Sequence, residues 1–431
     1  MIKKDTKEII VCIIELLIII SAIIWAYLGT KTVFVGETVT SRLATVYALI
    51  HNKTFYIRDS SNFSPNPFEQ RTVDKVKGKE GIISSKPPIF SLIMAGEYLI
   101  LKEFGYSLDN PQHLKPIVRF YIISLIIPLF ALSLLIIWRF LHSISASAPV
   151  RIATLAVLAF GTHWSAFSPH FTNHLPGGAL LIISLYCLWN IYRDKRSSIY
   201  GLLGGIFSSL VFTIDMPLTI FVAGGFLFLL WYKGLNKLIW IPIGALPVLL
   251  IHFSIMFHIT GSILPVQISN APFLFESSYW RHPVDVDALH HPKLVYTFNI
   301  LVGPKGIFLL YPVLVLSLLN FLPKFWNSYS PELKNLFISL LICFIVLNIY
   351  YILSTNNYGG MSYGFRWHAG SMPILALASI PFLEKVKKNK LFWVCWFFLF
   401  AISLYSSFEC RQHPWSIDKE WTTRLIFGPL I

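Results

Sequence analysis

Apolar runs long enough to cross a membrane recur along the whole of this 431-residue chain. About 20 consecutive apolar residues span ~30 Å of hydrocarbon as a helix. Only 13% of the residues are charged, roughly half the fraction expected of a soluble protein. We therefore predict an all-α integral membrane protein in a lipid bilayer, with a single multi-pass domain over residues 1–431. About eleven spans are expected, at residues 9–28, 116–138, 150–167, 174–192, 199–214, 217–232, 237–257, 304–322, 335–353, 367–383 and 391–408.

Basic residues indicate how these spans are oriented. Sixteen of the 35 Lys and Arg residues fall at the N-terminus and in short loops at alternate span ends, whereas four fall in the opposite loops after the first. An excess of Lys and Arg in short loops is typical of the cytoplasmic side. We therefore expect a cytoplasmic N-terminus and a C-terminus outside. The net charge of +14 follows this topology pattern and forms no binding stripe, so no nucleic-acid partner is predicted.

The first outer loop, residues 29–115, contains one further apolar stretch. Pro88 to Leu101 has only 14 residues and includes Glu97, which makes it too short to span the bilayer. We therefore expect interfacial helices in this loop. If the stretch did span, every later loop would change sides and the basic loops would face outward.

Lys86 stands directly before Pro87 and Pro88, at the expected start of that interfacial helix. Two prolines fix the backbone there and remove N–H groups that would lack partners in a first helical turn. A lysine ammonium at this depth can bind the phosphate of an anionic lipid headgroup as a point charge. The alternative interpretation is a lysine that extends to the interface and only anchors the helix.

Two carboxylates of the first outer loop are candidate proton acceptors. Glu37 follows the first span and precedes an amphipathic run, residues 41–50, with apolar residues at helical spacing. That run carries Arg42, a candidate substrate-binding residue, and Asp74 lies twelve residues before Lys86. A carboxylate at the membrane surface can act as a general base toward an attacking group. For either acid, the alternative is an ordinary solvated charge.

Asp215 lies between two apolar runs and is followed by Met216 and Pro217. An acid at that depth is a functional candidate, although a cap for the helix that begins at Pro217 is slightly favoured. His174 follows two other histidines, His163 and His170, but intervening prolines break any continuous helix. No Cys or carboxylate joins them in a zinc-like pattern. We therefore expect substrate contacts from His174 and predict no metal site.

Residues 356–367 form the second motif, with the sequence Asn-Asn-Tyr-Gly-Gly-Met-Ser-Tyr-Gly-Phe-Arg-Trp. Its glycines allow tight turns and a close approach of backbone to a ligand. Tyr358 and Tyr363 offer flat faces for a sugar or an isoprenoid chain, and Arg366 offers a fork of donors that matches phosphate oxygens. The alternative is a turn that returns the chain to the membrane, with Arg366 at headgroup depth.

Together these motifs resemble the GT-C superfamily of membrane glycosyltransferases, which includes aminoarabinose transferases and protein O-mannosyltransferases. The resemblance is carried by the polar loop after the first span, by residues 85–88, 160–174 and 303–308, and by residues 358–366, in that order along most of the chain. It implies a GT-C-like fold, a bacterial inner-membrane location and a polyprenyl-phosphate-linked sugar as donor. Lys86 and Arg366 would then bind the donor phosphate.

The resemblance also implies that an acid of the first loop is the catalytic base. The superfamily often has two adjacent acids soon after the first span, whereas this chain has Glu37-Thr38 there. The base therefore stays open between Glu37 and Asp74. We expect an inverting glycosyl transfer at the outer membrane face without a cofactor, since no divalent-cation site is indicated. The alternative is a transporter or flippase of a lipid-linked glycan, without chemistry.

Overall fold

The computed structural model describes residues 2–59, 65–235, 238–322 and 330–430. Within them, nine helices are long and apolar enough to cross a membrane, which confirms a multi-pass, mainly helical chain. One expected span was assigned to begin at residue 237, which lies outside the described residues. The nine are α1 (Ile2–Gly29), α4 to α5 (Leu114–Tyr121 and Ile127–Ser143), α8 (His174–Tyr192), α9 (Ser197–Ile214), α10 (Thr219–Lys233), α11 (Trp240–Thr260), α14 (Pro331–Ser354), α15 to α16 (Met372–Ala378 and Ile380–Val386) and α17 (Lys390–Gln412).

The other two expected spans are shorter apolar helices. In the first, α6 (Ala148–Phe160) ends at Gly161, and the hydroxyl of Thr162 then accepts the Ser165 amide and begins a separate helix, α7 (His163–Ala166). In the second, α13 (Ile307–Leu310) is followed by a 3₁₀ helix, Pro312–Phe321. Capping and proline thus divide apolar runs that look continuous in the sequence.

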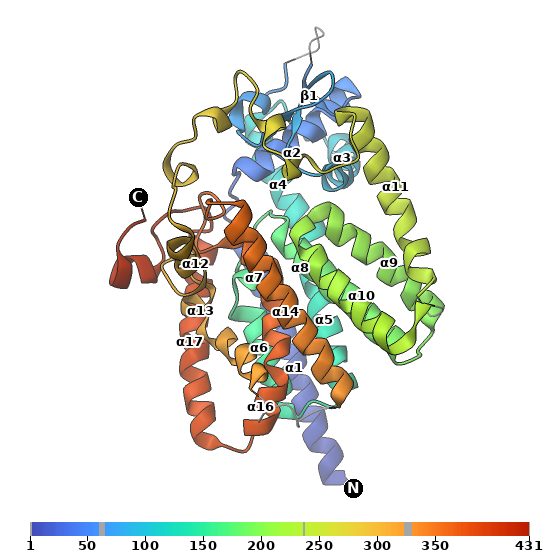
Figure 1. Ribbon diagram of the computed structural model, residues 1–431, viewed down its shortest axis with the longest axis vertical. Coiled ribbons are helices and arrows are strands. Elements are labelled where there is room, and N and C mark those ends of the chain that lie inside the picture. The colour runs from blue at the N-terminus through green and yellow to red at the C-terminus, as the bar shows by residue number, and fades with distance from the viewer. Residues whose placement is uncertain (1, 60–64, 236–237, 323–329, 431) are drawn as a thin grey trace.

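Residues 30–113, for which the sequence predicts an outer location and which we call the first outer segment, combine helices with a small sheet that the sequence analysis did not predict. The segment contains α2 (Glu37–Tyr47), the strands β1 (Tyr56–Asp59), β2 (Lys75–Lys77) and β3 (Gly81–Ser84), and α3 (Pro88–Glu103). The strands pair antiparallel in the order β1-β3-β2. As expected from its length, α3 is not among the spanning helices; it packs against α2. In Figure 1 these elements lie at the end of the molecule opposite the N-terminus.

Helices α9 and α11 pack closely against each other and run toward the outer segment (Figure 1). Gly205 and Gly244 permit this approach, because a Cβ on either would overlap backbone atoms of the partner helix. Two hydrogen bonds connect the segments after α7 and before α15 to the end of α17. His170 contacts the carbonyl of Arg411, and Tyr363 donates its amide to the carbonyl of Pro414. In the sequence, α11 is followed by the segment 261–292, which has only short 3₁₀ turns, and then by α12 (Lys293–Leu301).

A buried ion-pair network joins α1, α5 and α6 within the membrane-spanning part. Glu15 is fully buried, and its Oε1 lies 2.7 Å from Nε of Arg151. Its Oε2 accepts a hydrogen bond from the indole of Trp138 at 2.8 Å and lies 2.9 Å from Nε2 of His142. Oε1 of Glu8 lies 2.6 Å from Nη2 of Arg151, so Glu8 provides a second, half-exposed partner.

Replacing Glu15 with alanine should destabilise the protein strongly, because it removes the buried carboxylate that pairs with Arg151 and leaves only the half-exposed Glu8 to compensate the guanidinium charge. Breaking a buried pair by removing one partner costs about 3–5 kcal/mol. Glu8→Ala is the matched control, since the Glu8 side chain is 55% exposed and exposed pairs contribute about 0–1 kcal/mol. Thermal or SDS-induced unfolding of the detergent-solubilised protein measures both. Equal stability of the two variants would contradict this assignment.

Candidate functional site

Lys86 and Asp74 form an ion pair at the start of α3. The Lys86 Nζ lies 2.8 Å from Oδ2 of Asp74, and both side chains are largely covered, at 21% and 14% exposure. Pairing of β2 with β3 sets this geometry, because the Ser85 amide donates to the carbonyl of Asp74 at 3.0 Å. Ser41 of α2 donates to the same carbonyl at 2.5 Å. Three elements therefore fix the aspartate next to the lysine.

The charges around this pair determine its protonation. Burial on its own would raise the pKa of Asp74, but the neighbouring Lys86, Arg366 and Arg42 lower it below the ordinary value. Burial lowers the pKa of Lys86; Asp74 opposes this, and the two guanidiniums add to it. Asp74 is therefore an ionised carboxylate at neutral pH, and a weak base while the pair is intact.

Two arginines from distant segments contribute to the same group of charges. Arg42 of α2 is buried, and its guanidinium lies over the ring of Phe90 and donates to the carbonyl of Thr38. Burial lowers the pKa of Arg42 to about 10. The charges of Asp74 and Asp215 oppose this change, and the charge of Arg366 adds to it. The Arg366 guanidinium lies over the ring of Trp415, 5.6 Å from its centroid.

Both arginines have an unused donor. The Nε–H groups of Arg42 and Arg366 are buried, and no residue that the structure describes accepts a hydrogen bond from them. An unpaired buried donor on a charged group is costly. Together with Lys86, these donors suit an anionic ligand with several oxygens. Arg366 acts electrostatically on Lys86, and the binding of a donor phosphate by the two residues stays a prediction.

Asp215 and His174 also belong to this neighbourhood. The Oδ2 of Asp215 lies 2.9 Å from Nδ1 of His174, at the first residue of α8, and both side chains are buried. Asp215 does stand between α9 and the next helical turn, but its side chain makes no capping hydrogen bond. The favoured cap interpretation was therefore wrong, because the carboxylate bonds the histidine across the α8–α9 contact instead.

The other predicted residues support the site from outside it. Glu37 is exposed, and its Oε2 accepts the amide of Val73 at 2.9 Å, so it holds the segment that carries Asp74. Tyr358 and Tyr363 are buried. Their hydroxyls bond to His291 and Asn299, and to Glu409. Neither tyrosine therefore presents an exposed ring face for the substrate contact that the sequence predicted, because protein groups cover both rings.

A further carboxylate, Asp287, was missed by the sequence analysis. It lies half-buried in the segment 261–292, where its Oδ2 accepts the Tyr279 hydroxyl at 3.2 Å and its Oδ1 accepts the Asn357 amide. Burial raises the pKa of Asp287. The charge of Asp74 adds to this change, and the charge of Arg366 opposes it. No local pattern could have indicated it, because residues 284–287 read Val-Asp-Val-Asp in an irregular loop.

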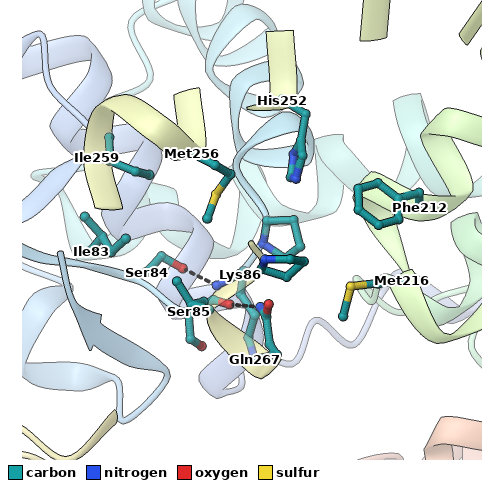
Figure 2. Close-up of a pocket in the computed structure, with 13 residues that line it drawn as sticks. Ile83, Ser84, Ser85, Lys86, Phe212, Met216, His252, Met256, Ile259 and Gln267 are labelled. Carbon is teal, nitrogen blue, oxygen red and sulfur yellow. Dashed lines mark hydrogen bonds between the residues drawn. The ribbon is translucent and has the colours of Figure 1, made fainter. Parts of the chain in front are cut away.

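An apolar pocket opens beside Lys86, between β3, α9 and α11 (Figure 2). The cavity itself is small, about 20 Å³, and the empty space along it, open solvent included, is about 390 Å³. Figure 2 shows Ser84, Ser85 and Lys86 along one side, where Gln267 donates to the Ser85 carbonyl at 2.5 Å. The rest of the wall is mainly apolar and is formed by Ile83, Pro87, Phe212, Met216, His252, Met256, Ile259, Pro265 and Val266.

One group of described residues has metal-ligand spacing, but its chemistry is unfavourable for an ion. Ligand atoms of Cys12, Glu15 and His142 lie within 4.8 Å of one another. Both carboxylate oxygens of Glu15 already have partners, and the Arg151 guanidinium lies 2.7 Å from one of them. A cation there would have to displace that guanidinium.

Comparison with known proteins adds no family to this description: no protein-family model matches the chain, and no curated protein matches it.

Proposed function

We propose that this chain is a polyprenyl-phosphate-sugar-dependent glycosyltransferase of GT-C-like fold. It would work at the outer face of a bacterial inner membrane, with the N-terminus in the cytoplasm and the C-terminus outside. One observation carries the proposal. Lys86, Arg42 and Arg366, from three separate segments, act on one another electrostatically, and Lys86 also lines an apolar pocket. A phosphate on an isoprenoid chain has both the charge and the apolar tail that this arrangement suits.

The chemistry follows from the charge that develops on the donor. When an acceptor attacks the anomeric carbon, the bond to the phosphate oxygen breaks and the polyprenyl phosphate leaves with one more negative charge. Fixed cations at that oxygen stabilise the transition state more than the ground state. A single direct displacement inverts the configuration at the anomeric carbon. The attacking group must lose its proton to one of the carboxylates nearby.

Release of free polyprenyl phosphate is the decisive test. Purified protein would be incubated with a panel of radiolabelled polyprenyl-phosphate sugars and an envelope extract as acceptor source, and the carrier would be separated by chromatography. A transferase releases polyprenyl phosphate and moves the label to the acceptor. A transporter or flippase binds the donor and leaves it intact, so intact donor across the whole panel would overturn the proposal.

Gly359→Ala should weaken binding of polyprenyl phosphate by moving Arg366. Gly359 has φ +88°, and a Cβ there would lie 3.0 Å from Cγ of Arg366. The left-handed conformation alone costs a non-glycine residue about 1–2 kcal/mol. Gly36→Ala is the matched control, because Gly36 has φ −90° and no atom would lie within 4 Å of its Cβ. Isothermal titration with polyprenyl phosphate measures both, and equal affinities would contradict the placement of Arg366.

A further inference from the structure

The segment 261–292 connects the two halves of the candidate site. At one point, the Trp280 indole donates to the carbonyl of Val73 at 3.0 Å, next to Asp74. At another, Asp287 accepts the side-chain amide of Asn357. Asp287 is therefore held between the segment that carries Asp74 and the segment that carries Arg366, although the three residues lie far apart in the sequence.

Asn357 links Asp287 to the glycines that support Arg366. Its Oδ1 accepts the amides of Gly359 and Gly360, at 2.6 and 2.5 Å. Both glycines have positive φ, and the Arg366 stem passes close to Gly359. The carboxylate thus has a fixed position relative to the arginine.

The four carboxylates near the cations differ in their hydrogen-bond partners, and Asp215 is bonded to His174 at 2.9 Å. Asp74 is paired with Lys86 at 2.8 Å, and Glu37 is exposed and bonded to the Val73 amide. Asp287 makes no ion pair at salt-bridge distance within the described ranges; its two partners are the neutral Tyr279 and Asn357. Each of its oxygens keeps a free lone pair that can accept a proton.

We propose that Asp287, held by Tyr279 and Asn357, is the general base that accepts the proton of the acceptor's attacking hydroxyl group. This inference rests on the proposed glycosyl transfer and names its acceptor class as an alcohol. The hydroxyl oxygen bonds to the anomeric carbon, and the bond from that carbon to the phosphate oxygen breaks with its electron pair. The hydroxyl proton moves to the Asp287 carboxylate, and the extra charge on the phosphate lies beside Lys86, Arg42 and Arg366.

The opposite environments of Asp287 and Asp74 support this division of roles. Burial raises the pKa of Asp287, whereas the surrounding cations lower that of Asp74. A base works best when its pKa is near the working pH. The charged or titratable groups around Asp287 are Tyr279 and Asp285 on its own segment, Asp74 and Arg366 on the facing segments, and His290 and Lys293, which bind the neighbouring Asn356.

The test compares pH profiles of the Asp287→Asn variant and the wild-type protein, with whichever polyprenyl-phosphate sugar the wild type turns over. The base must be ionised to act, so wild-type kcat/KM should rise with pH through the raised pKa of Asp287. Asp287→Asn should lower kcat by at least about 100-fold and remove that rise. Asp287→Glu should restore part of the rate together with the pH dependence. Polyprenyl phosphate affinity should be unchanged in both.

Asp285→Asn is the matched control, since Asp285 is exposed two residues away and has φ +53°, a conformation that asparagine tolerates. Asn357→Ala provides a second comparison, because it loosens the loop but keeps the Asp287 carboxylate. It should raise KM and retain the pH-dependent rise. If Asp287→Asn keeps the rise, or if Asp74→Asn removes it instead, the assignment of Asp287 is overturned while the transferase function stands. If the wild type turns over no donor, both fall.

Discussion

Replacing Lys86 with alanine should lower the rate of glycosyl transfer by about 100- to 1,000-fold, the effect of removing one fixed donor from a developing oxyanion. The loss should be larger than that of any exposed lysine. In the wild type, Lys86 neutralises Asp74 at 2.8 Å. Without the ammonium, the ionised carboxylate remains near the position proposed for the donor phosphate and repels it. The same change should therefore remove the preference for polyprenyl phosphate over the uncharged polyprenol.

Two comparisons separate this effect from general damage. Lys79→Ala, in the same outer segment, removes an ammonium that is 62% exposed and should leave both binding and transfer unchanged. Asp74→Asn removes the competing carboxylate and should retain or increase affinity for polyprenyl phosphate, since less negative charge then surrounds the ligand. Near-wild-type turnover by correctly folded Lys86→Ala protein would refute the phosphate-binding assignment.

The length of the apolar runs predicted nine of the expected helices, because bilayer thickness fixes how long a spanning helix must be. The expected spans 150–167 and 304–322 stay predictions, because the cap at Thr162 and the proline at 312 divide each of them into shorter helices. The sheet in the first outer segment escaped notice because its strands have only three or four residues. Strands that short have too few residues to show an alternating pattern.

Two candidate residues could be named from the backbone next to them, and their role in phosphate binding stays a prediction. Lys86 beside two prolines and Arg366 after a glycine-rich turn carry a local signal, and the structure brings their charges together. Asp215 shows what is lost without tertiary contacts, because its helix-cap pattern is ordinary and its partner, His174, is 41 residues away. Asp287 could be recognised as a candidate only from tertiary contacts, because its hydrogen bonds from Asn357 and Tyr279 set it apart from other loop acids.

Replacing Glu420 with glutamine should both destabilise the protein and abolish binding of polyprenyl phosphate. The Glu420 carboxylate lies 2.5 Å from Nζ of Lys305, and both side chains are almost completely buried. The same oxygen accepts the amide of Gly364 at 2.6 Å, and Lys305 donates to the carbonyl of Ser362. This pair therefore fixes the turn that leads into Arg366.

An uncompensated buried lysine costs about 3–5 kcal/mol, so the unfolding midpoint of Glu420→Gln should fall clearly below that of Glu276→Gln, the same change at an exposed glutamate. Replacing Lys305 and Glu420 together with methionine distinguishes the two effects. A buried ion pair can often be exchanged for apolar side chains at little cost, so this double variant should recover stability. It cannot restore the hydrogen bonds to Gly364 and Ser362, and polyprenyl phosphate binding should stay weak. If binding returns together with stability, the pair holds the fold together but does not position Arg366.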